Sequence, residues 1–142
     1  MEQLLNDAVQ FSHFLTNFLQ RTTTGIQRII APVLAVPGHP NIPLHQYPDN
    51  VINHFNRQAE PMMVGMTEME DAVNEVIHQL VHTFLPGVNQ MPPHIHNAVI
   101  QVMGRLVELR DQLTNLEEFF LDYRHYFEDP DETFNMTFAD FI

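Results

Sequence analysis

The feature that most constrains this chain is a long run of apolar residues at alternating four- and three-residue steps. The run consists of Ile95, Val99, Val102, Leu106, Leu109, Leu113, Leu116, Phe120 and Tyr123. This is the spacing of the a and d positions of a heptad, so it predicts one helix over residues 92–127 with a continuous apolar edge. At about 1.5 Å per residue, the repeat alone would be roughly 43 Å long.

A helix of that length exceeds the diameter of about 37 Å expected for a compact globule of this chain length. It must project, bend or pack along a second chain, and we expect the last. The pairing seam would be Val99, Val102, Leu106, Leu109, Leu113, Leu116 and Phe120. Gly104 is predicted to face outward and is the place where a bend is easiest, because glycine weakens a helix by about 1 kcal/mol relative to alanine.

Apolar residues at helical spacing predict further helices upstream. Thr22-Thr23-Thr24 should interrupt the first pattern, and proline should end the others. The expected elements are a helix over about 2–20, a short one from Thr24 to near Pro32, one over 50–59 closed by Pro61, and one from Thr67 to just before Pro86. The fold class is therefore all-α, a four- to five-helix bundle with a long heptad-patterned helix near the C-terminus.

Two segments differ in composition from the helices. Residues 36–48 are rich in proline, and we expect a structured connection over the core, because Ile42 and Leu44 would otherwise be in water. Residues 1–127 then form the helical domain, and residues 128–142 an acidic, aromatic tail. The tail has Phe134, Phe138 and Phe141 at helical spacing, which suits either docking into a groove of another protein or packing back onto this chain.

Charge and cysteine content exclude several classes of protein. Six basic residues, all of them arginine, stand against 18 acidic ones, for a formal charge of -12. Such a chain should not contact nucleic acid or an anionic membrane directly, since like charges repel. The absence of cysteine excludes disulfides and thiolate metal sites. We expect an intracellular protein, of cytoplasm or nucleus, because no basic signal segment or long apolar span is present.

His78 and His82 stand one helical turn apart, which is a metal-ligand spacing. In zinc proteases a glutamate beside the first histidine acts as the base, but here Gln79 holds that position and cannot accept a proton. Ser12 and His13 are adjacent and would point about 100° apart on a helix. No catalytic residues emerge, and we expect no enzymatic activity.

Glu75 with His78, and Asp122 with His125, match the carboxylate and histidine spacing of di-iron bundles. Both pairs are predicted to lie opposite their apolar stripes and to face solvent, which argues against an interior metal centre. No cofactor is therefore expected, apart from a surface or intersubunit Zn²⁺ at His78 and His82.

Together these patterns predict a non-enzymatic interaction module, a scaffold or adaptor that associates with itself, with a dimer favoured. Two alternatives remain open. The chain could carry an apolar ligand in a cavity lined by phenylalanine and methionine, or it could bind metal through His78 and His82.

Overall fold

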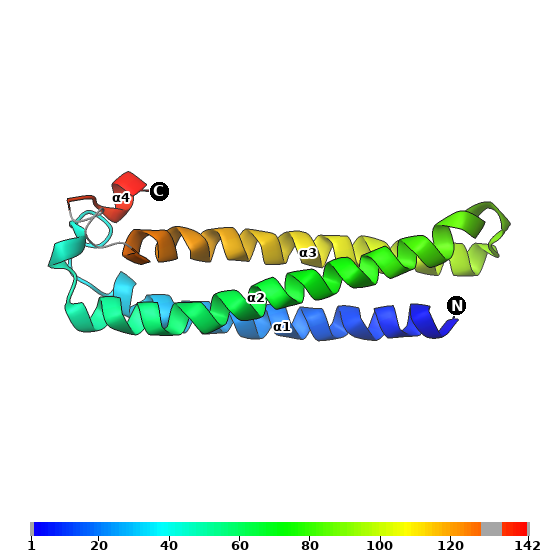
Figure 1. Cartoon of the computed structure of the whole chain (residues 1–142), viewed down its shortest axis with the longest axis horizontal. Coiled ribbons are helices and arrows are strands. Elements are labelled where there is room, and N and C mark those ends of the chain that lie inside the picture. The colour runs from blue at the N-terminus through cyan, green and yellow to red at the C-terminus, as the bar shows by residue number, and fades with distance from the viewer. Residues whose placement is uncertain (1, 129–134, 142) are drawn as a thin grey trace. The chain divides into compact units, whose positions relative to one another are not determined.

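A computed structural model describes residues 2–128 and 135–141, and the described chain is all-α (Figure 1). Most of it forms three long helices. These are α1 (Glu2–Leu34), α2 (Asp49–Phe84) and α3 (Pro93–Glu128).

Shorter elements lie between and after the long helices. The 3-10 helices η1 (Leu44–Gln46) and η2 (Leu85–Gln90) occupy the two connections, and α4 (Phe138–Phe141) follows α3. No helix within the described ranges has the length and apolar character needed to cross a membrane.

The expected interruption of the first helix at Thr22-Thr23-Thr24 is wrong, because α1 continues through it. The reason lies in burial. Thr22 is buried, and it continues the stripe that runs through Leu19 and Ile26 at four- and three-residue steps. The helix propensity of threonine is lower than that of alanine by only a fraction of a kcal/mol, so the continuous buried stripe outweighs it.

The expected end at Pro61 of the helix over residues 50–59 is also wrong, because α2 passes through this residue. Pro61 lies on the exposed side of the helix, as does Arg57, whose carbonyl loses its intrahelical donor there. An exposed carbonyl can bond to water instead. The buried positions on either side, Ala59 and Met66, meanwhile keep the apolar face of α2 continuous.

The helix expected over 92–127 is present as α3, and it is continuous through Gly104. Proline sets its start, since Pro93 occupies the first turn, where the missing N–H costs nothing. The hydrogen bond from the His96 N–H to the Pro92 carbonyl, at 2.9 Å, begins the helical ladder.

The chain divides into two compact units. Unit 1 comprises Met1–Gln20 and Met66–Thr114, and unit 2 comprises Arg21–Gly65 and Asn115–Ile142. Each long helix contributes one part to each unit. Each unit therefore combines two segments that are far apart in the sequence.

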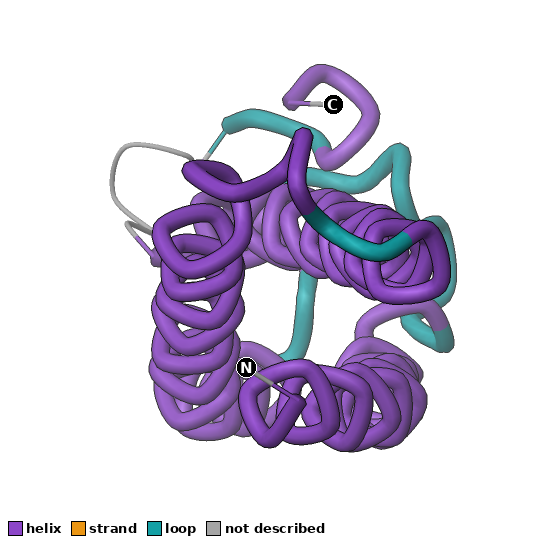
Figure 2. The backbone as a smooth tube through the Cα atoms, turned by 90° about the vertical axis from the view of Figure 1, so that its right-hand side faces the viewer, coloured by secondary structure: helices purple, strands orange, loops and turns teal. Residues whose placement is uncertain are grey.

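Unit 1 has a largely aliphatic core. Figure 2 faces the side of this unit on which α1 begins. Its buried side chains come from the first part of α1, the last part of α2 and the first part of α3, and they include Leu5, Leu15, Met66, Val73, Leu80, Phe84, Val99, Leu106 and Leu113.

Unit 2 has an aromatic core. Its buried rings are Tyr47, Phe55, Phe120, Tyr123, Tyr126, Phe127 and Phe138. Centroids of the Phe55 and Phe127 rings are 5.1 Å apart, and those of Tyr123 and Phe138 are 4.4 Å apart, within the range of favourable aromatic contacts.

The connection between α1 and α2 packs onto unit 2, as we expected for residues 36–48. Leu44 on η1 is buried and Ile42 is half-buried. The chain turns at Gly38, whose φ of 91° suits glycine and whose carbonyl accepts a bond from the Asn41 N–H at 2.8 Å. The following peptide bond, between His39 and Pro40, is cis.

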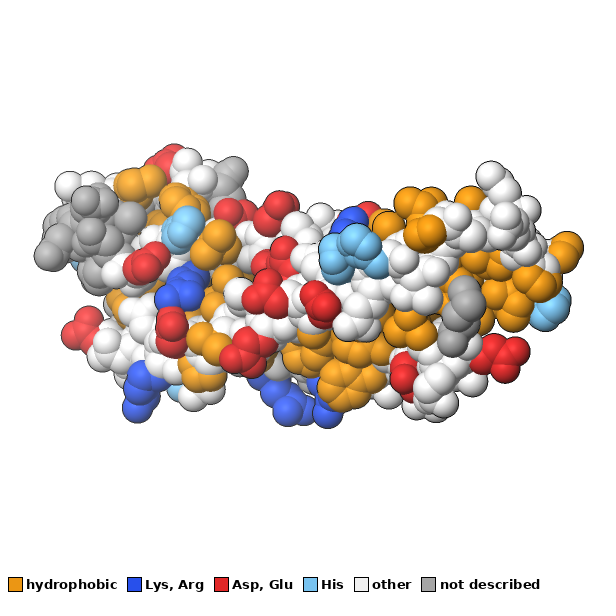
Figure 3. Space-filling model, turned by 45° about the vertical axis from the view of Figure 1, so that its right-hand side comes forward, with side chains coloured by type: hydrophobic (Ala, Val, Ile, Leu, Met, Phe, Trp, Pro, Cys, Tyr) orange, Lys and Arg blue, Asp and Glu red, His pale blue; other side chains and the backbone are white. Residues whose placement is uncertain are grey.

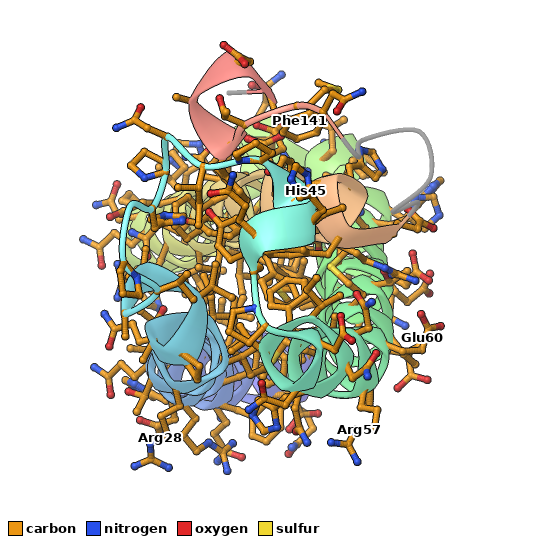
Figure 4. All side chains as sticks on the ribbon, turned by 90° about the vertical axis from the view of Figure 1, so that its left-hand side faces the viewer. Arg28, His45, Arg57, Glu60 and Phe141 are labelled. Carbon is orange, nitrogen blue, oxygen red and sulfur yellow. The ribbon has the colours of Figure 1, made fainter. Side chains whose placement is uncertain are left out.

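Charged side chains of unit 2 project away from this core. Figure 4 shows Arg28 on α1 and Arg57 and Glu60 on α2 pointing outward, whereas His45 lies on η1 and Phe141 on α4. Glu60 pairs with Arg124 of α3.

Candidate functional site

An apolar cavity opens in unit 1, where α2 gives way to η2 and α3 begins. Proline shapes this turn, because Pro86 lies at the start of η2 and Pro92-Pro93 opens α3. The cavity has a volume of about 190 Å³. Its lining is Leu80, Val81, Phe84, Leu85, Val88, Met91, His96, Val99, Ile100 and Met103.

A second cavity, of about 310 Å³, adjoins the first. The two share Phe84 and Met91 in their linings, and the second also reaches Leu5 and Glu2 of α1. Figure 3 shows hydrophobic side chains gathered at the right-hand end of the view, over the turn between α2 and α3. We call the surface around these two cavities the η2 groove.

Two aliphatic side chains stand at the border of the η2 groove and remain largely in water. Leu85 is 62% exposed and Ile100 is 55% exposed, although both also line the first cavity. A hollow and two projecting apolar side chains thus lie on one surface. Exposed apolar patches of this kind mark interaction sites or ligand grooves.

Most of the η2 groove lies in a stretch that carries no formal charge, although the lining of the second cavity also includes Glu2 of α1. From Val76 to Gly104 the sequence has no Asp, Glu, Lys or Arg, although the whole chain has a charge of -12. The titratable side chains of this stretch are four histidines, at positions 78, 82, 94 and 96. This gap in charge is the sequence signal that could have located the surface, and analysis of periodicity alone missed it.

The seam residues expected to pair with another chain lie inside this one. Val99, Val102, Leu106, Leu109, Leu113 and Phe120 are buried, and Leu116 is half-buried. The chain's own helices cover them, so the reasoning that sought a second helix for this edge is corrected. The other helices of the same chain therefore provide the packing partners of α3.

The tail residues lie differently from one another. Phe138 is fully buried among the rings of unit 2, and Phe141 is half-buried with its ring centroid 6.0 Å from that of Tyr126. Phe134 lies outside the described residues. The described part of the tail therefore packs back onto its own chain.

Main-chain bonds hold the tail against the loop that precedes α2. The Leu44 N–H donates to the Met136 carbonyl at 3.2 Å, and the Ala139 N–H donates to the Pro40 carbonyl at 3.1 Å. The Tyr126 hydroxyl also donates to the Met136 carbonyl, at 2.9 Å. Burial, with a smaller contribution from the Asp140 carboxylate, raises the pKa of Tyr126 to about 12, so this donor keeps its proton.

His39 and Tyr47 form a second polar contact in this loop. The His39 Nδ1 lies 2.7 Å from the Tyr47 hydroxyl, and the His39 ring packs against Phe138 with centroids 5.4 Å apart. Burial lowers the pKa of His39 and raises the pKa of Tyr47, because it penalises the charged form of each. Both groups are therefore neutral at pH 7, and the contact is an ordinary hydrogen bond.

The candidate metal residues lie on exposed faces, as their spacing predicts. His78 and His82 are exposed on α2, with ring centroids 4.1 Å apart. Glu75, Asp122 and His125 are exposed too. Within residues 2–128 and 135–141, no group of three or more histidine or carboxylate side chains could hold a metal ion.

The Ser12 hydroxyl bonds within its own helix. It is buried in α1, and its hydroxyl donates to the Val9 carbonyl at 2.6 Å. Such a bond to the preceding turn satisfies a buried hydroxyl.

Comparison of this chain with known protein families, with curated proteins and with solved structures finds no match.

Proposed function

We propose that this protein is a non-enzymatic interaction module that associates with a second copy of itself through the η2 groove. The observation that carries the proposal is the pairing of a hollow with projecting side chains on one surface, whose lining, among the residues that the structure describes, has Glu2 as its single charged side chain. In a two-fold dimer, each chain presents the same patch, so Leu85 of one copy can enter the cavity of the other.

The size of the cavity supports this arrangement. An apolar cavity of about 150 Å³ accommodates a benzene-sized group. A cavity of about 190 Å³ therefore has room for one leucine side chain. Burying the exposed part of a large aliphatic residue contributes up to about 1.5–3 kcal/mol, and two-fold symmetry makes each contact twice.

The η2 groove avoids much of the charge repulsion that opposes association of two copies. Two chains of charge -12 repel one another wherever their acidic faces meet. Residues 76–104 carry no formal charge, so contact there brings no acidic side chain of this stretch against another. The η2 groove therefore joins two acidic chains at low electrostatic cost.

Sedimentation equilibrium tests the proposal with variants that leave the core intact. The wild type should have twice the chain mass of 16.5 kDa at about 0.1 mM, whereas Leu85→Glu and Ile100→Glu should each weaken the dimer by at least 100-fold. Both side chains are more exposed than buried, so the variants should keep the helical circular dichroism of the wild type.

Val64→Glu is the matched control, because Val64 is 46% exposed on α2 in unit 2 and does not line the η2 groove. It should leave the mass unchanged. A wild type that is monomeric at 0.1 mM would overturn the proposal, as would a control that dissociates as much as Leu85→Glu.

The adjoining cavities favour a second candidate function, that of an apolar-ligand carrier. The second cavity, of about 310 Å³, alone reaches the lower end of the 300–1,000 Å³ typical of ligand pockets, and the first adds about 190 Å³ beside it. Native mass spectrometry of the freshly purified protein separates the two functions. A carrier gives a monomer with a bound lipid-sized mass, and the interaction module gives a dimer without one.

A further inference from the structure

His78 and His82 form an exposed pair of imidazoles on α2 that the proposed dimer does not use. They stand four residues apart, so both project from one face of the helix, one turn above the other. Their ring centroids are 4.1 Å apart and the ring planes are inclined at 64°. We propose that this pair binds one Zn²⁺ ion, with both imidazoles as ligands.

The geometry suits coordination to a single ion. Zn²⁺ binds histidine nitrogens at about 2.0–2.1 Å, and two such nitrogens on a tetrahedral ion lie about 3.3 Å apart. Ring centroids 4.1 Å apart place the two imidazoles within reach of one ion, and their exposed side chains can turn so that a nitrogen of each faces it.

The helix fixes the two ligands before any ion arrives. On the opposite side of α2, Leu80 and Phe84 are buried, and this packing holds the backbone that carries the histidines. The neighbouring Glu75 accepts a hydrogen bond from Gln79 at 3.2 Å, across the same turn of the helix. Because the backbone is already held, binding has to fix only the rotamers of the two side chains.

The chain supplies two ligands, and water or a group from another molecule completes the coordination. No third histidine or carboxylate of residues 2–128 and 135–141 joins this pair. The site should therefore bind Zn²⁺ more weakly than closed four-ligand structural sites do. Imidazole binds zinc in its neutral form, so acid should weaken binding.

Isothermal titration with ZnCl₂ at pH 7.5 tests the site in the full chain. The wild type should bind one ion through this pair, and His78→Ala and His82→Ala should each lower the affinity at least tenfold. Lowering the pH to 5.5 should weaken binding in the wild type. Both side chains are exposed, so neither variant should alter the helical content.

His13→Ala is the matched control, because His13 is an exposed histidine on α1 in unit 1 without a histidine one turn away. It should bind Zn²⁺ as the wild type does. An independent readout is hydrogen exchange, since an ion that bridges one turn should slow the amides of residues 78–84 in the wild type and not in His78→Ala.

Two results would overturn the proposal. One is a wild type that binds no Zn²⁺, and the other is undiminished binding in His78→Ala, which would place the ion elsewhere, such as at His94 and His96. Neither result bears on the dimer, because that is measured without metal and uses Leu85 and Ile100.

Discussion

Unit 1 and unit 2 are built from parts of the same three helices, yet they close their cores differently. In unit 2, rings fill the interior, and the loop before α2 and the chain end at α4 cover it through main-chain bonds. In unit 1 the interior is mostly aliphatic, and the six-residue η2 leaves two cavities beside it. The segments that cover each core therefore decide where apolar surface stays open, although parts of the same three helices build both units.

Removing a buried ring from unit 2 should have the largest effect on the free energy of unfolding. Phe55 is fully buried, and its ring centroid lies 5.1 Å from that of Phe127 and 5.6 Å from that of Phe120. Phe55→Ala should lower the free energy of unfolding by about 3–5 kcal/mol, because a large cavity replaces the ring. Urea unfolding measures the loss.

The unit 1 counterpart is Leu106→Ala, which should cost about 2–5 kcal/mol because Leu106 is also fully buried. Hydrogen exchange assigns each loss to a unit. Phe55→Ala should reduce protection chiefly among residues 21–65 and 115–128, and Leu106→Ala chiefly among residues 66–114. Equal loss throughout the chain in both variants would show that the two units open together.

The next largest effect on the free energy of unfolding should come from a hydrogen bond in the segments that cover unit 2. Tyr126→Phe removes the hydroxyl that donates to the Met136 carbonyl and should lower the free energy of unfolding by about 1 kcal/mol. The carbonyl keeps its bond from the Leu44 N–H, which limits the cost. Chemical denaturation gives the stability change. A variant as stable as the wild type would mean that the hydroxyl does not fasten the loop and α4.

Replacing a glycine on a helix should raise the free energy of unfolding, whereas the preceding substitutions lower it. Gly104 of unit 1 is exposed, and nothing lies within 4 Å of the position of an added Cβ, so Gly104→Ala should raise the free energy of unfolding by about 0.5–1 kcal/mol. Gly25 of unit 2 is the matched comparison. A Cβ there would stand 2.8 Å from the Met62 Cε, so Gly25→Ala should gain less. Thermal unfolding of both variants measures the difference, and an equal gain would contradict the close approach at Gly25.

The smallest expected effect is a pH dependence of the free energy of unfolding, which arises in unit 2. Burial lowers the pKa of His39 in the folded chain below the value of about 6.5 expected when the chain is unfolded. The unfolded state therefore binds this proton more tightly. The contribution of neutral His39 to stability is present above about pH 6.5 and is lost as the pH falls below it.

Comparison of the wild type with His39→Gln isolates the contribution of His39 to this pH dependence, because glutamine can still bond the Tyr47 hydroxyl but does not titrate. Stability measured between pH 7.5 and pH 5 should fall more in the wild type. Parallel curves for the two proteins would show that His39 does not link stability to pH.

Sequence patterns predicted the all-α class and placed α3 to within one residue at each end, because its apolar repeat is long and regular. They failed at Thr22 and Pro61, where local preference argued for a break. At Thr22 a stripe of buried residues passes through the position itself, and at Pro61 it runs along the opposite side of α2 through Ala59 and Met66. In both places this burial outweighs the local preference, and the partners of the stripe lie far away in the sequence.

The candidate site was less accessible to sequence analysis. The spacing of His78 and His82 predicted their shared exposed face, since helical geometry is local. The η2 groove depends on how Phe84, Met91 and Val99 pack around a turn, which no periodicity encodes. Burial of the seam likewise required knowing which helices of the chain would cover Leu106 and Leu113.

The fastening of the tail has a consequence for how freely its sequence can change. Both groups that hold position 136, the Leu44 N–H and the Tyr126 hydroxyl, bond to its main-chain oxygen. Every amino acid offers that same atom. Mutations of the Met136 side chain should therefore accumulate without loosening these two bonds, whereas the buried Tyr126 has far less freedom to vary.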